Sequence, residues 1–206
     1  MKPKILLCVP ALALGLSLPL ALSPTAEGTA APARAETFRV DTGHSSVIYR
    51  VQHLGVSNFY GTFKDVSGTV VLDEDKPSDS SVEIAIDAAS VDSRSEQRDG
   101  HLTSPDFFSA KEFPEITFES TKVKKGKEKG HFEVTGDMTV RGVTKSMTVD
   151  VELTGKDSTR MGYRAGFEAE FVLHMPDYKM PAMEKMDASM LGRDVHVIVA
   201  IEAIRE

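Results

Sequence analysis

The sequence predicts an all-β protein, either a sandwich or a closed barrel, with one short helical insertion. Most segments alternate apolar and polar residues with a period of two, as strands with one dry face do. Turn residues recur at roughly 10-residue spacing, which is typical of antiparallel sheets. Residues 93–109 lack the alternation and are the one helical segment expected, which argues against a parallel α/β sheet. The length of 206 residues suits one domain.

The first 35 residues have the features of a secretory signal peptide. A basic start precedes an apolar run over residues 5–22, and the small-x-small sequence Ala33-Arg34-Ala35 follows it. Two prolines interrupt the run, which favours cleavage over an uncleaved membrane anchor. Cys8 lies too early for a lipoprotein. We expect cleavage near Ala35, a folded domain over residues 36–206, and a periplasmic or secreted protein.

Composition narrows the classes of partner. Removing residues 1–35 takes away three basic residues and one acidic residue, so the net charge changes from −7 to −9. This acidity argues against binding to nucleic acids or anionic membrane surfaces, which both attract positive charge. The only cysteine, Cys8, leaves with the signal peptide, so the mature chain has no disulfide.

About eight or nine alternating segments are predicted as strands, in a pattern with turns between them. The clearest cover residues 47–51, 59–72, 82–86, 116–121, 132–141, 147–153, 167–173 and 195–201. A bulge at Lys64-Asp65 shifts the phase of the second segment. Arg141-Gly142 predicts a tight hairpin turn, because glycine adopts turn dihedrals that other residues resist. A closed barrel would leave no exposed strand edge.

Residues 93–109 form the predicted helical insertion. Ser93 and Glu96 have the spacing of a capping box, so a short helix should follow. Phe107 and Phe108 come after a turn at Pro105. They either cap the barrel and form a mouth, or make a plug that never opens.

Many ordered segments carry a resemblance to a known family. They are His44-Ser45-Ser46-Val47, Val51-Gln52-His53-Leu54-Gly55, Gly61-Thr62-Phe63, Gly68-Thr69-Val70, Ile86-Asp87-Ala88-Ala89-Ser90-Val91-Asp92, Gln97-Arg98-Asp99, His101-Leu102, Asp106-Phe107-Phe108, Phe113-Pro114, Ile116-Thr117-Phe118, Thr135-Gly136-Asp137 and Gly142-Val143-Thr144-Lys145. Over residues 37–205 the chain resembles the YceI-like family of periplasmic lipid-binding proteins.

The resemblance implies an extended, lipocalin-like antiparallel barrel of eight strands. It also implies non-catalytic binding, storage or transport of a polyisoprenoid, isoprenoid quinone or similar long-chain lipid in the lumen. No cofactor other than such a lipid is expected. The expected partners are a long apolar small molecule, a membrane or membrane partner met transiently, and a second copy in a homodimer.

The chain departs from the family pattern after its late strand. A polar Asn-Arg-Ser-Asp-Phe-Gly-like run is usual there, whereas this chain has His174-Met175-Pro176-Asp177-Tyr178-Lys179. Met175 stands at the arginine position and Lys179 at the glycine position. The resemblance therefore implies no headgroup contact from this loop.

The candidate lipid-binding residues are those on the dry phase of the strands, together with the phenylalanine pair. They are Val47, Tyr49, Val51, Phe63, Ile84, Ile86, Phe107, Phe108, Phe118, Met138, Met147, Val149, Phe167 and Phe171. Small residues on the same phase, Gly61, Gly68, Gly136 and Ala169, are expected to leave space. The alternative is a solid side-chain core, which would make the protein a structural or interaction module.

A methionine-rich loop spans residues 175–190. It holds Met175, Met180, Met183, Met186 and Met190, near His174. Flexible thioethers can form an adaptable apolar lid over a lipid. The alternative is a periplasmic copper-handling protein, because soft sulfur ligands suit Cu(I).

Catalytic signatures are absent from the sequence. The six histidines show no His-x-x-x-His spacing, and no nucleophile elbow, P-loop or dinucleotide fingerprint occurs. Arg98, Asp99 and Glu96 fit a solvated or capping helix at least as well as acid–base chemistry. An enzyme is therefore not expected.

Overall fold

The computed structural model describes residues 35–206, so the predicted signal peptide lies outside the described residues except for Ala35. Eleven strands occur in the described part of the chain. They are β1 (Glu36–Val40), β2 (Ser46–His53), β3 (Ser57–Phe63), β4 (Val66–Leu72), β5 (Ser81–Asp87), β6 (Val91–Asp92), β7 (Glu115–Lys125), β8 (His131–Val140), β9 (Val143–Thr159), β10 (Gly162–His174) and β11 (Leu191–Arg205).

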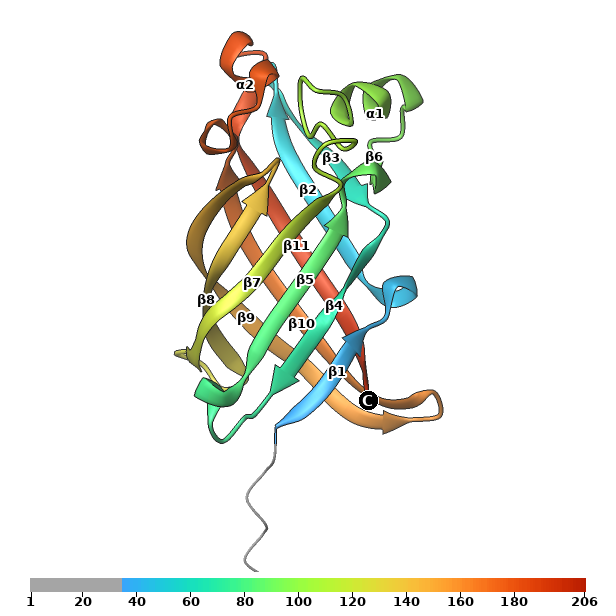
Figure 1. The fold of residues 1–206 in the computed structure, drawn as a ribbon, viewed down its shortest axis with the longest axis vertical. Helices are drawn as coiled ribbons and strands as arrows, with labels where there is room; N and C mark the ends of the chain where they lie inside the picture. The colour runs from blue at the N-terminus through green and yellow to red at the C-terminus, as the bar shows by residue number, and fades with distance from the viewer. Residues whose placement is uncertain (1–34) are drawn as a thin grey trace, which may run out of the picture. The chain divides into compact units, whose positions relative to one another are not determined.

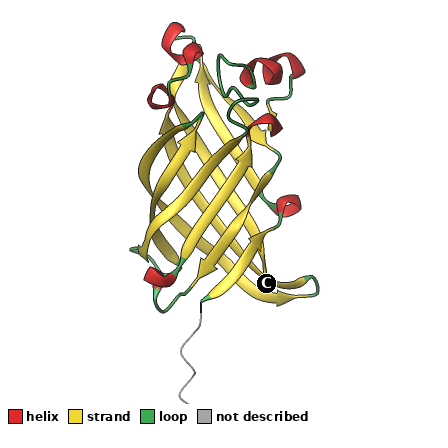
Figure 2. Ribbon diagram, in the orientation of Figure 1, coloured by secondary structure: helices red, strands yellow, loops and turns green. Residues whose placement is uncertain are grey.

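The sheet closes into a barrel of eight strands, as predicted. The hydrogen-bonded ring runs β1-β4-β5-β7-β8-β9-β10-β11 and returns to β1, where Phe38 pairs with Arg205 (Figures 1 and 2). All pairings are antiparallel. β2 continues β1 along β11, and β3 pairs with β2. β1 with β2, and β3 with β4, thus act as two long strands that are each interrupted once.

The interruptions coincide with local hydrogen bonds that replace ladder bonds. Between β1 and β2 lies the 3₁₀ turn η1 (Thr42–His44), where the Ser45 hydroxyl donates to the Asp41 carbonyl over 2.8 Å. Between β3 and β4, the amide of Lys64 donates to the Ser90 carbonyl over 3.2 Å. The predicted phase shift at Lys64-Asp65 is confirmed, because Phe63 and Val66 are both buried although three residues apart.

The hairpin between β8 and β9 has the predicted turn. Val140 pairs with Val143, and Arg141 and Gly142 both have positive φ, 51° and 69°. Two successive left-handed residues are the geometry of a type I′ turn, whose twist matches that of the strands. A Cβ on Gly142 would lie 2.5 Å from the Phe113 ring, so glycine is required for space as well as for φ.

The predicted helix exists but begins two residues later than the capping box suggested. α1 spans Glu96–Leu102, and its N-cap is Ser95, whose hydroxyl accepts from the Arg98 amide over 3.4 Å. Ser93 is instead fully buried, and both its amide and its hydroxyl donate to the Asp99 carboxylate. The Ser93 cap was therefore wrong, because that serine is used in a tertiary contact.

Further short helices were not predicted. α2 spans Pro181–Lys185, and three more 3₁₀ turns are η2 (Pro77–Asp79), η3 (Ala88–Ser90) and η4 (Met175–Tyr178). α1 and α2 lie at the same end of the barrel (Figure 1). No helix among the described residues has the length and apolar character needed to cross a bilayer.

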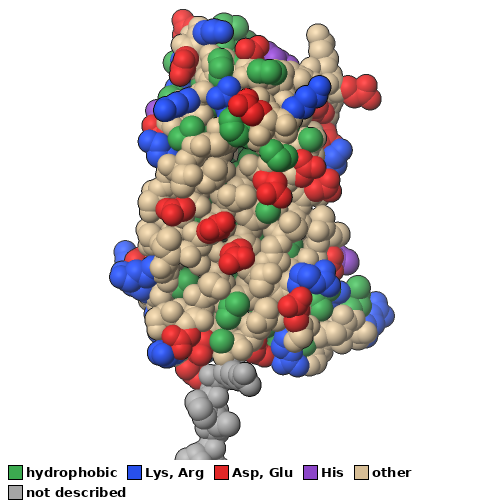
Figure 3. Space-filling model, in the orientation of Figure 1, with side chains coloured by type: hydrophobic (Ala, Val, Ile, Leu, Met, Phe, Trp, Pro, Cys, Tyr) green, Lys and Arg blue, Asp and Glu red, His purple; other side chains and the backbone are tan. Residues whose placement is uncertain are grey.

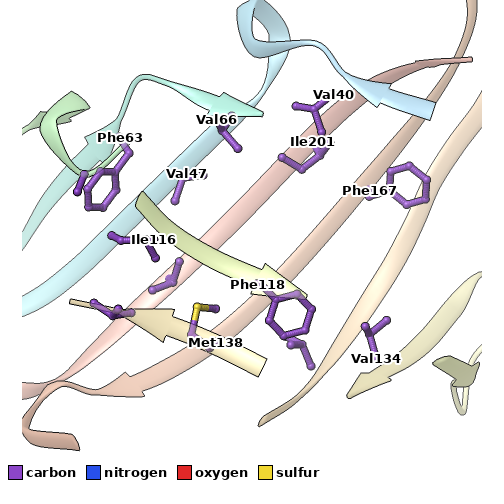
Figure 4. Close-up of a cluster of buried hydrophobic side chains, with 14 of the residues drawn as sticks. Val40, Val47, Phe63, Val66, Ile116, Phe118, Val134, Met138, Phe167 and Ile201 are labelled. Carbon is purple, nitrogen blue, oxygen red and sulfur yellow. The ribbon is translucent and has the colours of Figure 1, made fainter. Parts of the chain in front are cut away.

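The barrel interior holds the hydrophobic side chains. Val47, Phe63, Phe118 and Phe167 come from four different strands, Ile116 shares β7 with Phe118, and all five are buried in the core (Figure 4). The outside is mostly polar: over β4, β5 and β7, acidic side chains are scattered and hydrophobic ones are isolated (Figure 3). The alternation therefore separates a dry lumen from a wet exterior.

Candidate ligand-binding cavity

The barrel encloses a cavity of about 210 Å³. Its lining includes thirteen of the fourteen candidate residues, namely Val47, Tyr49, Val51, Phe63, Ile84, Ile86, Phe107, Phe108, Phe118, Met138, Val149, Phe167 and Phe171. Met147 does not line it but is half-buried against the core. The middle of the barrel is thus not filled by its own side chains, as a solid core would require.

Sequence reasoning missed more lining positions than it found. They continue the same inward phase on other strands or come from the caps, and they include Val70, Leu72, Val82, Leu102, Ile116, Val123, Phe132, Val134, Val140, Val151, Leu173, Leu191, Val195, Val197, Val199 and Ile201. The alternation of β11 carried the signal for the last four. The signal for Val123 was obscured by a register shift between Ser120 and Lys122.

The lining is almost entirely apolar. Apart from the Tyr49 phenol, the residues with polar side chains around the cavity are Ser80, Thr117 and Glu168. Glu168 is the one charged residue of that lining, and it is exposed on the outside of the barrel. The cavity therefore suits an uncharged, extended apolar molecule, which is held by its removal from water.

The glycines on the inward phase do not leave space as expected. Gly61 is covered by the Tyr49 ring, and Gly136 by the Phe118 ring, because a Cβ would lie 2.2 Å and 2.5 Å from those aromatic side chains. At Gly68, φ is 150° and a Cβ would lie 2.1 Å from the Glu83 carbonyl oxygen. At each of these glycines, the ring or backbone of a neighbouring strand occupies the space that a side chain would need. Of the four small residues, only Ala169 lines the cavity as predicted.

Two caps close the end of the barrel near α1 and α2. Phe107 and Phe108 line the cavity from the α1 side, and Phe108 meets Phe63 edge-on with ring centres 5.5 Å apart. Arg141, in the β8–β9 turn, joins the caps by donating to the carbonyl oxygens of Pro105 and Lys179 over 3.2 and 3.1 Å. The phenylalanine pair therefore covers this end of the lumen.

The methionine-rich loop forms the other cap. Met175, Met180 and Met183 line the cavity and are buried, and Met180 is only 1% exposed. Met190 is half-exposed. His174 is exposed on the outer side, where its Nδ1 lies 2.7 Å from an Asp194 carboxylate oxygen. The buried sulfurs do not gather with this imidazole, so the copper alternative is not supported, whereas a flexible lid fits the position.

Within residues 174–179, where the chain departs from the family pattern, Lys179 has a left-handed backbone conformation. Lys179 has φ 52° and ψ 44°, the left-handed conformation that glycine adopts most easily. Met175 places an apolar side chain in the cavity lining where the family pattern has arginine. This stretch adds no charge to the lumen.

Tyr49 is the polar exception inside the barrel. Its hydroxyl is buried and has no hydrogen-bond partner among the described residues. The ring lies over Gly61, its partner across β2 and β3, and its centre is 5.9 Å from that of Phe63. Burial, together with the nearby Asp99 carboxylate, raises the pKa of Tyr49 to about 12. The phenol therefore stays protonated at any physiological pH.

A second cluster of ionisable groups lies outside the lumen, at the break between β1 and β2. Asp41, His44 and Glu202 offer oxygen and nitrogen atoms close together. The Arg164 guanidinium lies among them, 2.7 Å from Asp41 and in contact with Glu202. The hydrogen bond from Arg164, followed by that from His44, lowers the pKa of Asp41 to about 2. The cluster is an ion-pair network that joins β1, β10 and β11.

Comparisons with known proteins agree with this architecture. The YceI-like domain family matches residues 38–203. Protein YceI of Escherichia coli O157:H7 is 38% identical over 181 residues, covering 86% of this chain and 92% of that protein. The structure of BcnA from Burkholderia cenocepacia has a TM-score of 0.72 at 23% identity, covering 79% of this chain and 98% of BcnA.

A further solved structure is described as a polyisoprenoid binding domain from Saccharophagus degradans. It has a TM-score of 0.63 at 14% identity and covers 84% of this chain and 100% of that domain. At 23% and 14% identity, these two structures show the similarity of the fold alone. The family match over nearly all of the described domain goes further, and this chain belongs to the YceI-like family.

Proposed function

We propose that this protein binds a long-chain apolar lipid, a polyisoprenoid, isoprenoid quinone or similar molecule, inside the barrel, and stores or carries it without catalysis. The observation that supports this most is the apolar cavity, which touches Leu102 near the caps and also Leu72 and Phe132 toward the other end. A slim extended chain matches such a space. The polyisoprenoid-binding description of a structural neighbour points to the same ligand class.

Burial supplies the binding energy in this proposal. Each CH₂ removed from water contributes about 0.8 kcal/mol, so a prenyl chain is held by its length rather than by polar contacts. Met175, Met180 and Met183 can repack around guests of different shape, because thioether side chains are unbranched and flexible. The ligand is expected to leave unchanged.

The test is native mass spectrometry and organic extraction of the purified protein, with a pair of variants on β10. Ala169 lines the cavity, so Ala169→Phe should fill it and abolish co-purification of lipid. Val172 is exposed on the same strand, so Val172→Phe should retain the lipid. If the wild-type protein yields no apolar molecule and binds no prenyl quinone, the proposal is wrong.

Transient contact with a membrane is part of the proposal, since a carrier must collect its lipid. Leu54, Val56 and Met190 are exposed, and the Leu54 amide donates to the Met190 carbonyl over 3.0 Å, which places the β2–β3 turn beside the methionine-rich loop. The double variant Leu54→Ser/Val56→Ser should slow lipid exchange with neutral vesicles. Unchanged exchange would remove this role for the turn.

Export and oligomeric state also remain predictions. We propose processing near Ala35 and a periplasmic or secreted location, which N-terminal sequencing of the mature protein checks. The homodimer is checked by sedimentation equilibrium at several concentrations.

A further inference from the structure

One outer face of the barrel presents large apolar side chains to water. The strands β3, β2, β11 and β10 lie side by side there. Ile48 on β2, Tyr60 on β3 and Val172 on β10 are 36%, 47% and 47% exposed. Single exposed apolar residues are normal on a protein surface, whereas several gathered on one face mark a surface that another molecule covers.

The strand register arranges the outward side chains of this face in two rows. The first row crosses the four strands through Tyr60, Arg50, His196 and Val172, and the second contains Ile48, Ile198 and Glu170. Together the rows line a groove of about 390 Å³ on the outside of the barrel wall. We name the surface formed by these seven residues the groove face. Because it is hollowed, a second rounded wall can approach it closely.

Charges of both signs lie within the groove face. Arg50 is half-buried and Glu170 is exposed, and neither forms an ion pair with any residue of the described range 35–206. They lie two strands and one row apart, about 12 Å between Cα atoms at ordinary strand spacing. Each is therefore available to an opposite charge from outside the molecule.

The other side of the barrel wall has a different character. Glu83, Glu119 and Asp137 are neighbours across β5, β7 and β8, and acidic side chains are scattered over β4, β5 and β7 (Figure 3). The whole chain has a net charge of −7, so a second copy is repelled from that side. The groove face, which combines Arg50 with an acidic residue and apolar side chains, is the surface that an acidic copy can approach.

We propose that the groove face is a homodimer interface, on which a second copy of this chain packs about a two-fold axis crossing β11 between His196 and Ile198. In a two-fold interface, residue i of each copy meets residue j of the other. An axis in the plane of the interface, perpendicular to the line from Arg50 to Glu170, brings Arg50 onto the partner's Glu170. The symmetry then forms this ion pair twice.

The apolar residues complete the interface under the same symmetry. Ile48 and Val172 lie on the other diagonal of the two rows, close to the axis, so each meets its own counterpart in the second copy. They exclude water between the two ion pairs. This inference assigns a surface to the expected homodimer and does not depend on lipid binding, because these side chains point away from the lumen.

The test is sedimentation equilibrium of the full-length mature protein with charge reversals. Arg50→Glu and Glu170→Arg should each raise the dimer dissociation constant by at least about tenfold, because like charges then face each other in both contacts. The double variant Arg50→Glu/Glu170→Arg should restore the dimer by exchanging the two charges. Glu119→Arg is the matched control, since it makes the same charge change at an exposed position of β7 and should leave the dimer intact.

The apolar contribution is tested with Ile48→Ser/Val172→Ser, which should be a folded monomer by circular dichroism. A wild-type protein that stays monomeric at every concentration would overturn the interface. So would a dimer that survives both single reversals, or a double variant that remains monomeric. All of these variants should still co-purify with lipid, so failure of the interface and failure of the proposed function give different results.

Discussion

The buried Tyr49 hydroxyl, packed against Gly61, lowers the stability of the protein. Because the Tyr49 hydroxyl is buried with no hydrogen-bond partner among residues 35–206, it carries a desolvation cost of about 1–3 kcal/mol. Tyr49→Phe should therefore raise the melting temperature of the delipidated protein, by about 2–4 °C per kcal/mol for a domain of this size. Differential scanning calorimetry measures this, and a lower melting temperature would show that the hydroxyl has a partner inside the protein.

Asp41 gives the fold a pH dependence at its β1–β2 break. Its pKa is lowered from 3.8 to about 2, chiefly by the hydrogen bond from Arg164. A lowered folded-state pKa means that the stabilising contribution is complete above about pH 4 and is lost as pH falls toward 2. The melting temperatures of wild type and Asp41→Asn should differ at pH 6 and converge near pH 2. A difference that persists at pH 2 would contradict this assignment.

Prediction from the sequence succeeded for side chains whose direction, into or out of the barrel, follows from the alternation within one strand. The inward phase of Val47, Ile84 and Phe167 follows from period two alone. The space expected beside Gly61 does not exist, because the ring that fills it belongs to the neighbouring strand. Nor could the isolation of the Tyr49 hydroxyl be predicted, since lacking a partner depends on everything that surrounds the group.

At the scale of elements, the segment 88–114 takes the place of a strand in the barrel wall. β5 ends at Asp87, and the chain then passes through η3 to β6, which pairs with β3 at only two positions, Thr62↔Asp92 and Phe63↔Val91. α1 and the phenylalanine cap follow. The wall near the caps is thus held by fewer ladder hydrogen bonds than the rest of the ring.

Hydrogen exchange should reveal this difference. Amides of β6 and α1 are expected to exchange faster than those in the middle of β8 and β9, which pair without interruption from His131↔Glu152 to Val140↔Val143. Exchange followed by mass spectrometry on the delipidated protein measures it, and ligand binding should slow the β6 and α1 amides selectively. Uniform protection across both regions would show that segment 88–114 is as firmly held as the ladder.

The short helices explain why elements were harder to predict than strands. The hydroxyl of Ser93 has the right spacing for a cap, but it instead donates a hydrogen bond to Asp99 and accepts one from Arg98. α2 has only five residues, too few for a periodic signal, and it is stabilised by contacts such as the Ala182 amide donating to the Asp106 carbonyl over 2.9 Å. Both outcomes depend on contacts distant in sequence.

For the whole molecule, a long apolar lumen predicts that affinity follows chain length. Each added CH₂ buried should contribute about 0.8 kcal/mol, measured against ligand free in water, until the chain is longer than the cavity. Titration with prenyl alcohols of increasing length checks this, with Ala169→Phe as the control expected to saturate at a shorter chain. Affinity independent of length would mean that the tail does not enter the barrel.

Barrel closure was the feature of the whole molecule that could be predicted from the sequence. Local alternation allowed a sandwich or a barrel, and the family resemblance selected eight strands. The cavity volume was beyond reach, because it depends on how rings such as Phe118 and Tyr49 pack over the opposite strand.

The seam of the ring has a consequence for how the protein is made. The first strand, β1, pairs with β4 and gains its second ring partner only when residues Ala203–Arg205 of β11 pair with Val40, Arg39 and Phe38. Synthesis from the N-terminus therefore cannot complete the cylinder until the final residues have emerged. Until then the apolar inner surface is exposed to water. During this interval a chaperone, or the first ligand, can bind to it.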